Sequence, residues 1–242
     1  KGDFMDVCAI QWLSLDNDTI NYIPQKVNLE KHLTYNEFEI LIENLNKSSI
    51  IKCFTASATS VDNRKIYMLE IGNGLRNVLF VGGVHAREVA NPQFLIKFAV
   101  HLANEYENQN PDIIRLLSEY KIIMLPNANP DGYAASVEGA KQVKNKSLFF
   151  GNFSDSELAK AKSNANGVDL NRNFPSYSAS LGWEGNKMHM GLSETKPSLD
   201  YFAGYKLGSE NETKVLMNFI MRYVPFAYRF VDFHSAGRLI YA

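Results

Sequence analysis

The stretch Asn77-Val78-Leu79-Phe80-Val81-Gly82-Gly83-Val84, followed directly by His85-Ala86-Arg87-Glu88, decides the fold. An uninterrupted apolar run that ends in two glycines is typical of a central strand buried on both faces of a sheet. In an open α/β sheet, ligands bind beyond the carboxyl ends of the strands. The polar residues that follow this run are therefore the first candidates for a functional site.

Strands and helices alternate on both sides of this run. The expected elements are a helix opened by the capping box Thr34-Tyr35-Asn36-Glu37, strands at 50–56, 65–71 and 77–84, a helix at 92–106, a strand at 121–126 that is stopped by a turn at 127–132, a polar surface loop with a short helix inside it at 139–166, a helix opened by a second capping box at 209–212, and a buried strand at 227–233. Because helices separate the strands, we expect an α/β fold with a mixed, mostly parallel twisted sheet and helices on both faces.

The domain organisation follows from the same pattern. We expect residues 31–242 to form one α/β domain. Residues 1–30 are expected to be a short β-rich lead-in or the tail of an upstream module. The two cysteines, Cys8 and Cys53, are too few for a disulfide framework. One disulfide between them and two buried free thiols both remain open.

Composition excludes some partners. A formal net charge of −1 gives no reason to expect binding to nucleic acid or to an anionic membrane. No apolar run approaches the roughly 20 residues that a membrane-spanning helix needs. The chain begins at Lys1 without an initiator Met, so the lack of a signal peptide decides nothing, and the oligomeric state is left open.

Polar residues after two predicted buried strands suggest a metal site. His85 and Glu88 are three residues apart at a strand-to-helix junction, so both side chains can reach one point, and His234 ends another predicted strand. Zn²⁺ accepts imidazole and carboxylate ligands, and a catalytic zinc keeps a fourth position open. A His-x-x-Glu pair on its own is more often an ordinary surface pair, so both interpretations stand at this point.

Four motifs in order resemble the zinc carboxypeptidase family typified by carboxypeptidase A. They are Gly83-Val84-His85-Ala86-Arg87-Glu88, Asn129-Pro130-Asp131-Gly132-Tyr133, Gly167-Val168-Asp169-Leu170-Asn171-Arg172-Asn173-Phe174-Pro175 and Phe233-His234-Ser235. The match extends from about residue 34 to the end. It implies a zinc carboxypeptidase-like catalytic domain that binds one Zn²⁺ per chain through His85, Glu88 and His234.

The resemblance also implies roles for the residues around the metal. Asp169 matches a carboxylate that orients a ligand imidazole, here that of His85. Arg87 matches an arginine that contacts the substrate backbone. Asn171 and Arg172 match the pair that binds the terminal carboxylate of the substrate, and a guanidinium fork suits a planar carboxylate.

The sequence departs from the family pattern at two catalytic positions. Lys144 stands where the family places an oxyanion-stabilising arginine, and a solvated lysine in a mobile loop is the competing interpretation. The family's catalytic glutamate lies well downstream of the third ligand, and no residue between His234 and Ala242 matches it. We therefore expect a C-terminally incomplete domain that is inactive as it stands, for want of a general base.

The motif wording favours one substrate class. The run Val168 to Pro175 and the sequence His-Ala-Arg-Glu resemble bacterial members of the family, several of which cleave γ-D-glutamyl–diamino acid bonds in cell-wall peptides. This predicts a secreted or cell-wall-associated peptidase. Two alternatives are a general C-terminal metallocarboxypeptidase and a non-catalytic homologue that binds zinc or peptides. A metal-free hydrolase is disfavoured, because no Gly-x-Ser-x-Gly elbow is present.

Overall fold

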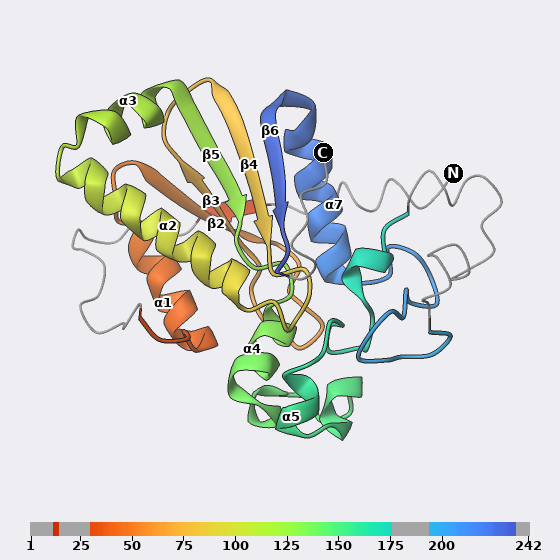
Figure 1. Cartoon of the computed structure of the whole chain (residues 1–242). Coiled ribbons are helices and arrows are strands. Elements are labelled where there is room, and N and C mark those ends of the chain that lie inside the picture. The colour runs from red at the N-terminus through yellow and green to blue at the C-terminus, as the bar shows by residue number, and fades with distance from the viewer. Residues whose placement is uncertain (1–11, 15–29, 176–193, 236–242) are drawn as a thin grey trace.

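A computed structural model of the chain describes residues 12–14, 30–175 and 194–235. Its centre is a six-stranded sheet in the order β1-β2-β3-β5-β4-β6 (Figure 1). The strands are β1 (Trp12–Ser14), β2 (Ile51–Ala56), β3 (Tyr67–Ile71), β4 (Arg76–Gly82), β5 (Tyr120–Leu125) and β6 (Ala227–Phe233). The α-helices are α1 (Tyr35–Leu45), α2 (Ala90–Glu107), α3 (Pro111–Glu119), α4 (Pro130–Glu138), α5 (Asp155–Leu158) and α7 (Asn211–Tyr223). Short 3₁₀ helices span Ala140–Gln142, Phe149–Asn152, Leu170–Arg172 and Val224–Phe226.

The sheet is mixed, as the sequence predicts, but it is less parallel than expected. β4 is parallel to both β5 and β6, whereas β1–β2, β2–β3 and β3–β5 are antiparallel. β2 and β3 are joined by residues 57–66, which contain a turn around Asp62 but no helix, and neighbouring strands without a helical crossover between them pair antiparallel. Helical crossovers precede β5 and β6, so parallel pairing is confined to β5-β4-β6.

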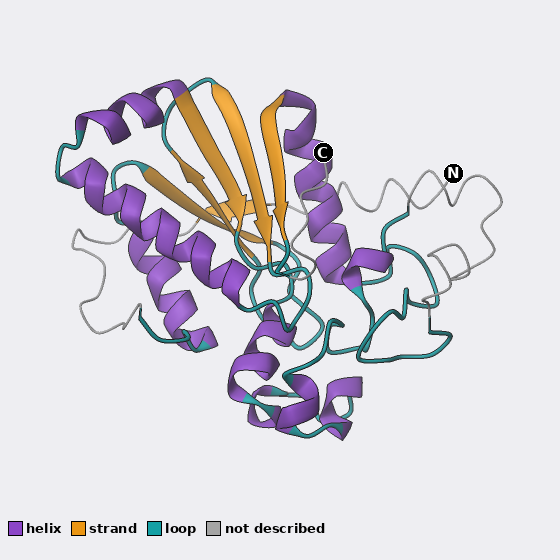
Figure 2. Ribbon diagram, in the orientation of Figure 1, coloured by secondary structure: helices purple, strands orange, loops and turns teal. Residues whose placement is uncertain are grey.

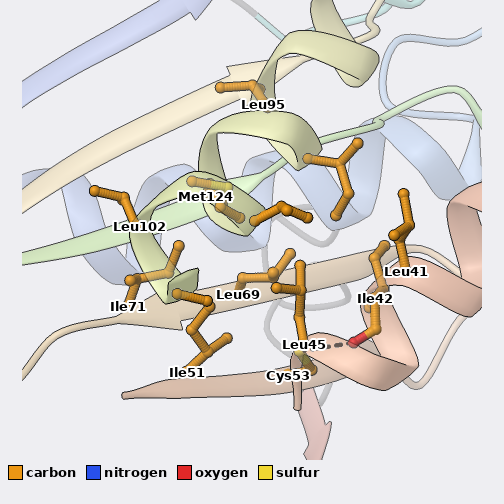
Figure 3. Packing of buried hydrophobic residues seen from close by; sticks show 14 of the residues in the cluster. Leu41, Ile42, Leu45, Ile51, Cys53, Leu69, Ile71, Leu95, Leu102 and Met124 are labelled. Carbon is orange, nitrogen blue, oxygen red and sulfur yellow. Dashed lines mark hydrogen bonds between the residues drawn. The ribbon is translucent and has the colours of Figure 1, made fainter. Parts of the chain in front are cut away.

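Helices cover both faces of the sheet (Figure 2). On one face, α1 and α2 pack against the strands in the larger apolar cluster, which includes Leu41, Ile42, Leu45, Ile51, Leu69, Ile71, Leu95, Leu102 and Met124 (Figure 3). On the other face, α7 contributes Val215, Leu216 and Phe219 to a second cluster with β3, β4 and β5. No helix in the described residues is long and apolar enough to cross a bilayer.

The capping box at the start of α1 forms as predicted. The Thr34 hydroxyl accepts from the Glu37 N–H at 3.2 Å, and the Glu37 carboxylate accepts from the Thr34 N–H at 2.8 Å. Further along, Cys53 is buried and its thiol donates to the carbonyl oxygen of Ile42 at 3.3 Å. Cys8 lies outside the described residues, so their pairing stays untested.

The prediction of a buried strand at 227–233 is wrong for the described residues. β6 has one neighbour, β4, and lies at the edge of the sheet. Tyr228, Phe230 and Val231 are 40 % exposed or more. Apolar content indicates a strand here, but the burial of that strand depends on what lies beside it.

Three other local expectations need correction. Asn129-Pro130-Asp131-Gly132 does not simply end β5; the Asn129 side chain accepts from the Gly132 N–H and begins α4. Helix α3 was not predicted, although Asn110 caps it and Pro111 occupies its first turn. The segment 139–166 contains the expected short helix, α5, but it is more than a surface loop, because a small cluster of buried apolar side chains, including Val143, Phe150 and Leu158, holds it together.

Helix α7 begins where predicted, but not by the predicted mechanism. Its N-cap residue, Glu210, makes no side-chain capping bond. The carboxyl group of Glu212 instead points inward, where it accepts from the Val61 N–H at 3.3 Å and from the Asn164 amide at 3.4 Å. Glu212 is fully buried. The Glu212 carboxyl group, which the sequence pattern assigns to the helix cap, therefore makes a tertiary contact instead.

Glu212 lies in the field of a second buried acid, Asp131. Asp131 accepts from the Arg64 guanidinium at 2.9 Å, the Ser60 hydroxyl at 2.8 Å and the Asp62 N–H at 2.8 Å. Burial raises the pKa of Glu212 to about 8, and the negative charge of Asp131 adds to this rise. With Arg64 committed to Asp131, Glu212 keeps its proton at neutral pH.

The Glu212 proton makes stability depend on pH. In the unfolded chain this carboxyl ionises near its ordinary pKa of 4.5, whereas the folded chain keeps the proton up to about pH 8. The free energy of unfolding should therefore fall by about 1.4 kcal/mol per pH unit between these values. Glu212→Gln should remove this decline, as measured by urea unfolding at several pH values. The exposed Glu119→Gln is the control, and parallel curves for wild type and Glu212→Gln would contradict the assignment.

Candidate metal centre

A tight turn after β4 shapes the first half of the site. Gly83 has a φ of +67°, and a Cβ added there would lie 2.7 Å from the Pro92 ring and 2.8 Å from the Asn127 side-chain oxygen. The loop that follows is held by main-chain bonds: Ala86 donates to the carbonyl of Lys162 at 3.1 Å and Arg87 to that of Ala161 at 2.8 Å. The segment at 161–162 therefore fixes the loop that carries His85 and Glu88.

The second half of the site comes from β6. Because β4 and β6 are parallel and pair Gly82 with Phe233, both strands end at the same edge of the sheet. His85 Nδ1 lies 2.9 Å from one oxygen of Glu88, and His234 Nδ1 lies 3.0 Å from the other. One ligand atom from each of these residues lies within 4.8 Å of the others. The structure thus brings together the three predicted ligands.

Hydrogen bonds hold the Glu88 carboxylate in place. One of its oxygens accepts from the Ser235 N–H at 3.1 Å and from the Asn91 amide at 3.4 Å. The same Asn91 amide donates to the carbonyl of Phe233 at 2.9 Å. Asn91 therefore ties the start of α2 to the end of β6, so the two halves of the site cannot separate without breaking these bonds.

The outer nitrogen of each imidazole faces a carboxylate. His234 Nε2 lies 3.1 Å from Asp232, and the buried His85 Nε2 lies 3.5 Å from Asp169, as the predicted role of Asp169 requires. A carboxylate at Nε2 favours the tautomer with the proton there, which leaves the Nδ1 lone pair for a metal. Two Nδ1 atoms and one carboxylate are a donor set that fits Zn²⁺.

Mutual charge effects also suit a cation. Burial raises the pKa of Glu88, but His234 and His85 lower it further, to well below its ordinary value. Burial lowers the pKa of His85, but Asp169 and Glu88 outweigh this and raise it. Asp232 and then Glu88 raise the pKa of His234 to about 10. Positive charge is thus favoured between these groups, and a divalent ion supplies it in place of the imidazole protons.

Two of the predicted substrate-binding residues are linked to the metal triad. The Asp169 carboxylate accepts from the Asn171 N–H at 3.0 Å and lies 3.7 Å from the Arg172 guanidinium. Because Asp169 also faces His85, one buried carboxylate joins the triad to the predicted carboxylate-binding pair. Arg87 lies 3.8 Å from Asp200 and donates to the carbonyl of Lys160 at 3.2 Å.

Lys144 makes its described contacts elsewhere. Its ammonium donates to the carbonyl of Asn63 at 3.1 Å, and its N–H donates to the Asp62 carboxylate at 2.7 Å. These contacts tie Lys144 to the turn between β2 and β3. Its predicted oxyanion role stays a prediction.

Sequence reasoning missed two residues that contact the ligands. Asn91 carries no signal of its own, because its role depends on the approach of β6 to α2. Asp232 could have been found, because it lies two residues before His234 and residues at this spacing share one face of a strand.

The mixed α/β sheet thus carries, at the carboxyl edge of its parallel strands, a His–Glu–His set that could hold a metal ion. The chain belongs to the zinc carboxypeptidase family, whose sequence pattern matches residues 39–242. This confirms the family that the four motifs indicate. The bacterial and cell-wall features inferred from the same motifs are separate questions.

Several known proteins are similar to this chain. The catalytic chain of mouse carboxypeptidase N is 32% identical over 168 residues, which cover 66% of this chain and 33% of that protein. Mouse mast cell carboxypeptidase A is 29% identical over 186 residues, covering 75% and 39%. The crystal structure of carboxypeptidase A from Helicoverpa armigera superposes with a TM-score of 0.61 at 24% identity, covering 87% of this chain and 47% of that one. The chain thus spans less than half the length of each of these relatives.

The metal centre predicts a simple stoichiometry. The purified chain should contain about one zinc ion, because three ligands converge on a single point. His234→Ala should lose most of it, whereas His101→Ala, which removes an exposed histidine on α2, should retain it. Inductively coupled plasma mass spectrometry measures this directly. Unchanged zinc in His234→Ala would show that the ion is bound elsewhere.

Proposed function

We propose that this chain is the metal- and substrate-binding part of a zinc-dependent carboxypeptidase, which hydrolyses a peptide bond near a free carboxylate of its substrate. One observation carries the proposal: Asp169 contacts both the His85 imidazole and the Arg172 guanidinium. A group bound by Arg172 is therefore positioned relative to the metal site through a single buried side chain.

The residues divide the work between metal and substrate. When bound, Zn²⁺ supplies Lewis-acid polarisation of the peptide carbonyl. His85, Glu88 and His234 hold the ion, and Asp169 and Asp232 orient the two imidazoles. Asn171 and Arg172 bind the substrate carboxylate; Arg172 is 19% exposed, so it offers its fork from a partly desolvated position where charge-assisted bonds are stronger.

The general base is a separate matter. Among the described residues, the carboxylates in contact with the two imidazoles are Glu88, Asp169 and Asp232, and each is engaged by a ring nitrogen. Proton transfer to the leaving amine needs a carboxylate that is free to gain and lose a proton. We therefore propose that these 242 residues bind peptide without turning it over at a normal rate.

Two substrate classes have support. The curated relatives are named carboxypeptidases, which favours removal of a C-terminal residue from ordinary peptides. The motifs at 85–88 and 168–175 resemble those of bacterial members, which favours the γ-D-glutamyl–diamino acid bond of cell-wall peptides. If the substrate is the cell-wall peptide, we expect this protein to be secreted or associated with the cell wall.

Carboxylate recognition can be tested by binding alone. The zinc-loaded chain should bind an N-acetylated tripeptide with a free C-terminal carboxylate about tenfold more tightly than the same tripeptide amide, since charge-assisted bonds are worth roughly 1.5–3 kcal/mol. Arg172→Met should remove the difference in isothermal titration calorimetry. Arg115→Met, an exposed substitution on α3, is the control. Equal affinity of the wild-type chain for acid and amide would refute this role of Arg172.

The substrate class can be decided with the full-length protein. A murein tripeptide and N-acylated C-terminal dipeptides should be offered side by side, with product release followed by mass spectrometry. We expect hydrolysis of one class at a rate at least ten times that of the other. Hydrolysis of neither would favour a non-catalytic binding protein.

A further inference from the structure

One cation beside the metal centre has no acidic partner. The Lys162 ammonium lies 4.1 Å from the centroid of the Tyr201 ring. Within the described residues, no carboxylate lies at ion-pair distance from it. The side chain is half-buried, and the face of the Tyr201 ring lies directly against its charge.

The Lys162 main chain is fixed to the metal loop. Its carbonyl accepts from the Ala86 N–H at 3.1 Å, and its own N–H donates to the carbonyl of Leu199 at 2.8 Å. Ala86 lies between the two ligands of the His-x-x-Glu motif. Lys162 is thus anchored beside the triad, unlike a lysine on a free surface loop.

Tyr201 places a second cation at the same ring. The Arg172 guanidinium carbon lies 5.2 Å from the Tyr201 centroid. Two positive charges within 5.2 Å of one ring centroid repel each other, and a negatively charged group beside them would offset this repulsion. Both also act on one carboxylate: despite burial, the pKa of Asp169 is lowered first by His85 and then by Arg172 and Lys162.

The backbone at Tyr201 is held in an unfavourable conformation. Its φ is +66°, a value that aromatic residues rarely adopt outside strained positions. The next residue, Phe202, is buried, and its carbonyl accepts from the Asp169 N–H at 2.7 Å. The segment is therefore pinned to Asp169, and this pinning keeps the ring beside both cations at a cost in backbone energy.

The charges around the ring are unbalanced. Arg172 lies 3.7 Å from the Asp169 carboxylate, and Arg87 lies 3.8 Å from that of Asp200. Among the described residues, Lys162 forms no ion pair of this kind. A substrate with one carboxylate engages Arg172 and leaves Lys162 unpaired. A substrate with a second anionic group near the first would satisfy both cations.

We propose that Lys162, presented on the Tyr201 ring, is a specificity-determining residue that binds a second carboxylate, so that the preferred substrates are peptides with an acidic side chain among their last three residues. The inference rests on the proposed function, because it takes Arg172 as the site of the terminal carboxylate. It adds a substrate class that neither the family membership nor the metal triad implies.

Matched pairs of neutral and acidic peptides test the proposal. N-acetylated alanine tripeptides with a free C-terminus should carry Glu or Gln at each position in turn, and their affinities for the zinc-loaded chain should be measured by calorimetry. At one position we expect Glu to bind roughly three- to tenfold more tightly than Gln. Lys162→Met should reduce this ratio to about one, Lys162→Arg should keep it, and trialanine affinity should not change.

Two further variants make the result specific. Lys52→Met removes an exposed lysine on β2 and should leave the Glu/Gln ratio unchanged. Tyr201→Phe keeps the ring and should also preserve the ratio, with thermal melting confirming that each variant is folded. A ratio near one in the wild type, or one that survives in Lys162→Met, overturns the second subsite while carboxylate binding at Arg172 stands. Failure to bind any of the tripeptides overturns both.

Discussion

The register between β4 and β6 is the constraint on which the site depends. Gly82 pairs with Phe233, so the residues that follow the two strands emerge side by side at the carboxyl edge. A shift by one residue would turn His234 to the opposite face. With the observed register, one carboxylate, Glu88, lies within 3.0 Å of an imidazole nitrogen from each strand end. The metal centre is a consequence of strand pairing.

Buried polar side chains convert this register into a rigid site. Asn91 links Glu88 to the end of β6, and Asp169 links His85 to Arg172. Asn129, which is fully buried, donates to the carbonyls of Val84 and Ser163, so the start of α4 supports the same loop. Each of these groups would be costly to bury unpaired. The site is therefore stabilised by the same bonds that fix its geometry.

Local signals predicted most of the strands and helices, and the resemblance of four ordered motifs to one family indicated the three residues that the structure brings together. The capping box at Thr34 depends on a few neighbouring residues and forms as predicted. The apolar run of β4 correctly predicts a strand, but not its burial on both faces, because Val78 and Phe80 on one face are only partly buried. The exposure of β6 and the inward turn of Glu212 depend on residues far away in sequence, and pattern reasoning gave the wrong answer for both. The contact between Lys162 and Tyr201 has no local signature at all, because it arises where a loop meets the metal-binding turn.

The most direct test of the shared site is X-ray absorption spectroscopy at the zinc edge of the metal-loaded chain. The account predicts a first shell of nitrogen and oxygen atoms at about 2.0–2.1 Å, with outer scattering from two imidazole rings. In His234→Ala the outer scattering should fall to that of one ring. A sulfur shell near 2.3 Å, or a shell without imidazole scattering, would show that the metal is not held by His85, Glu88 and His234.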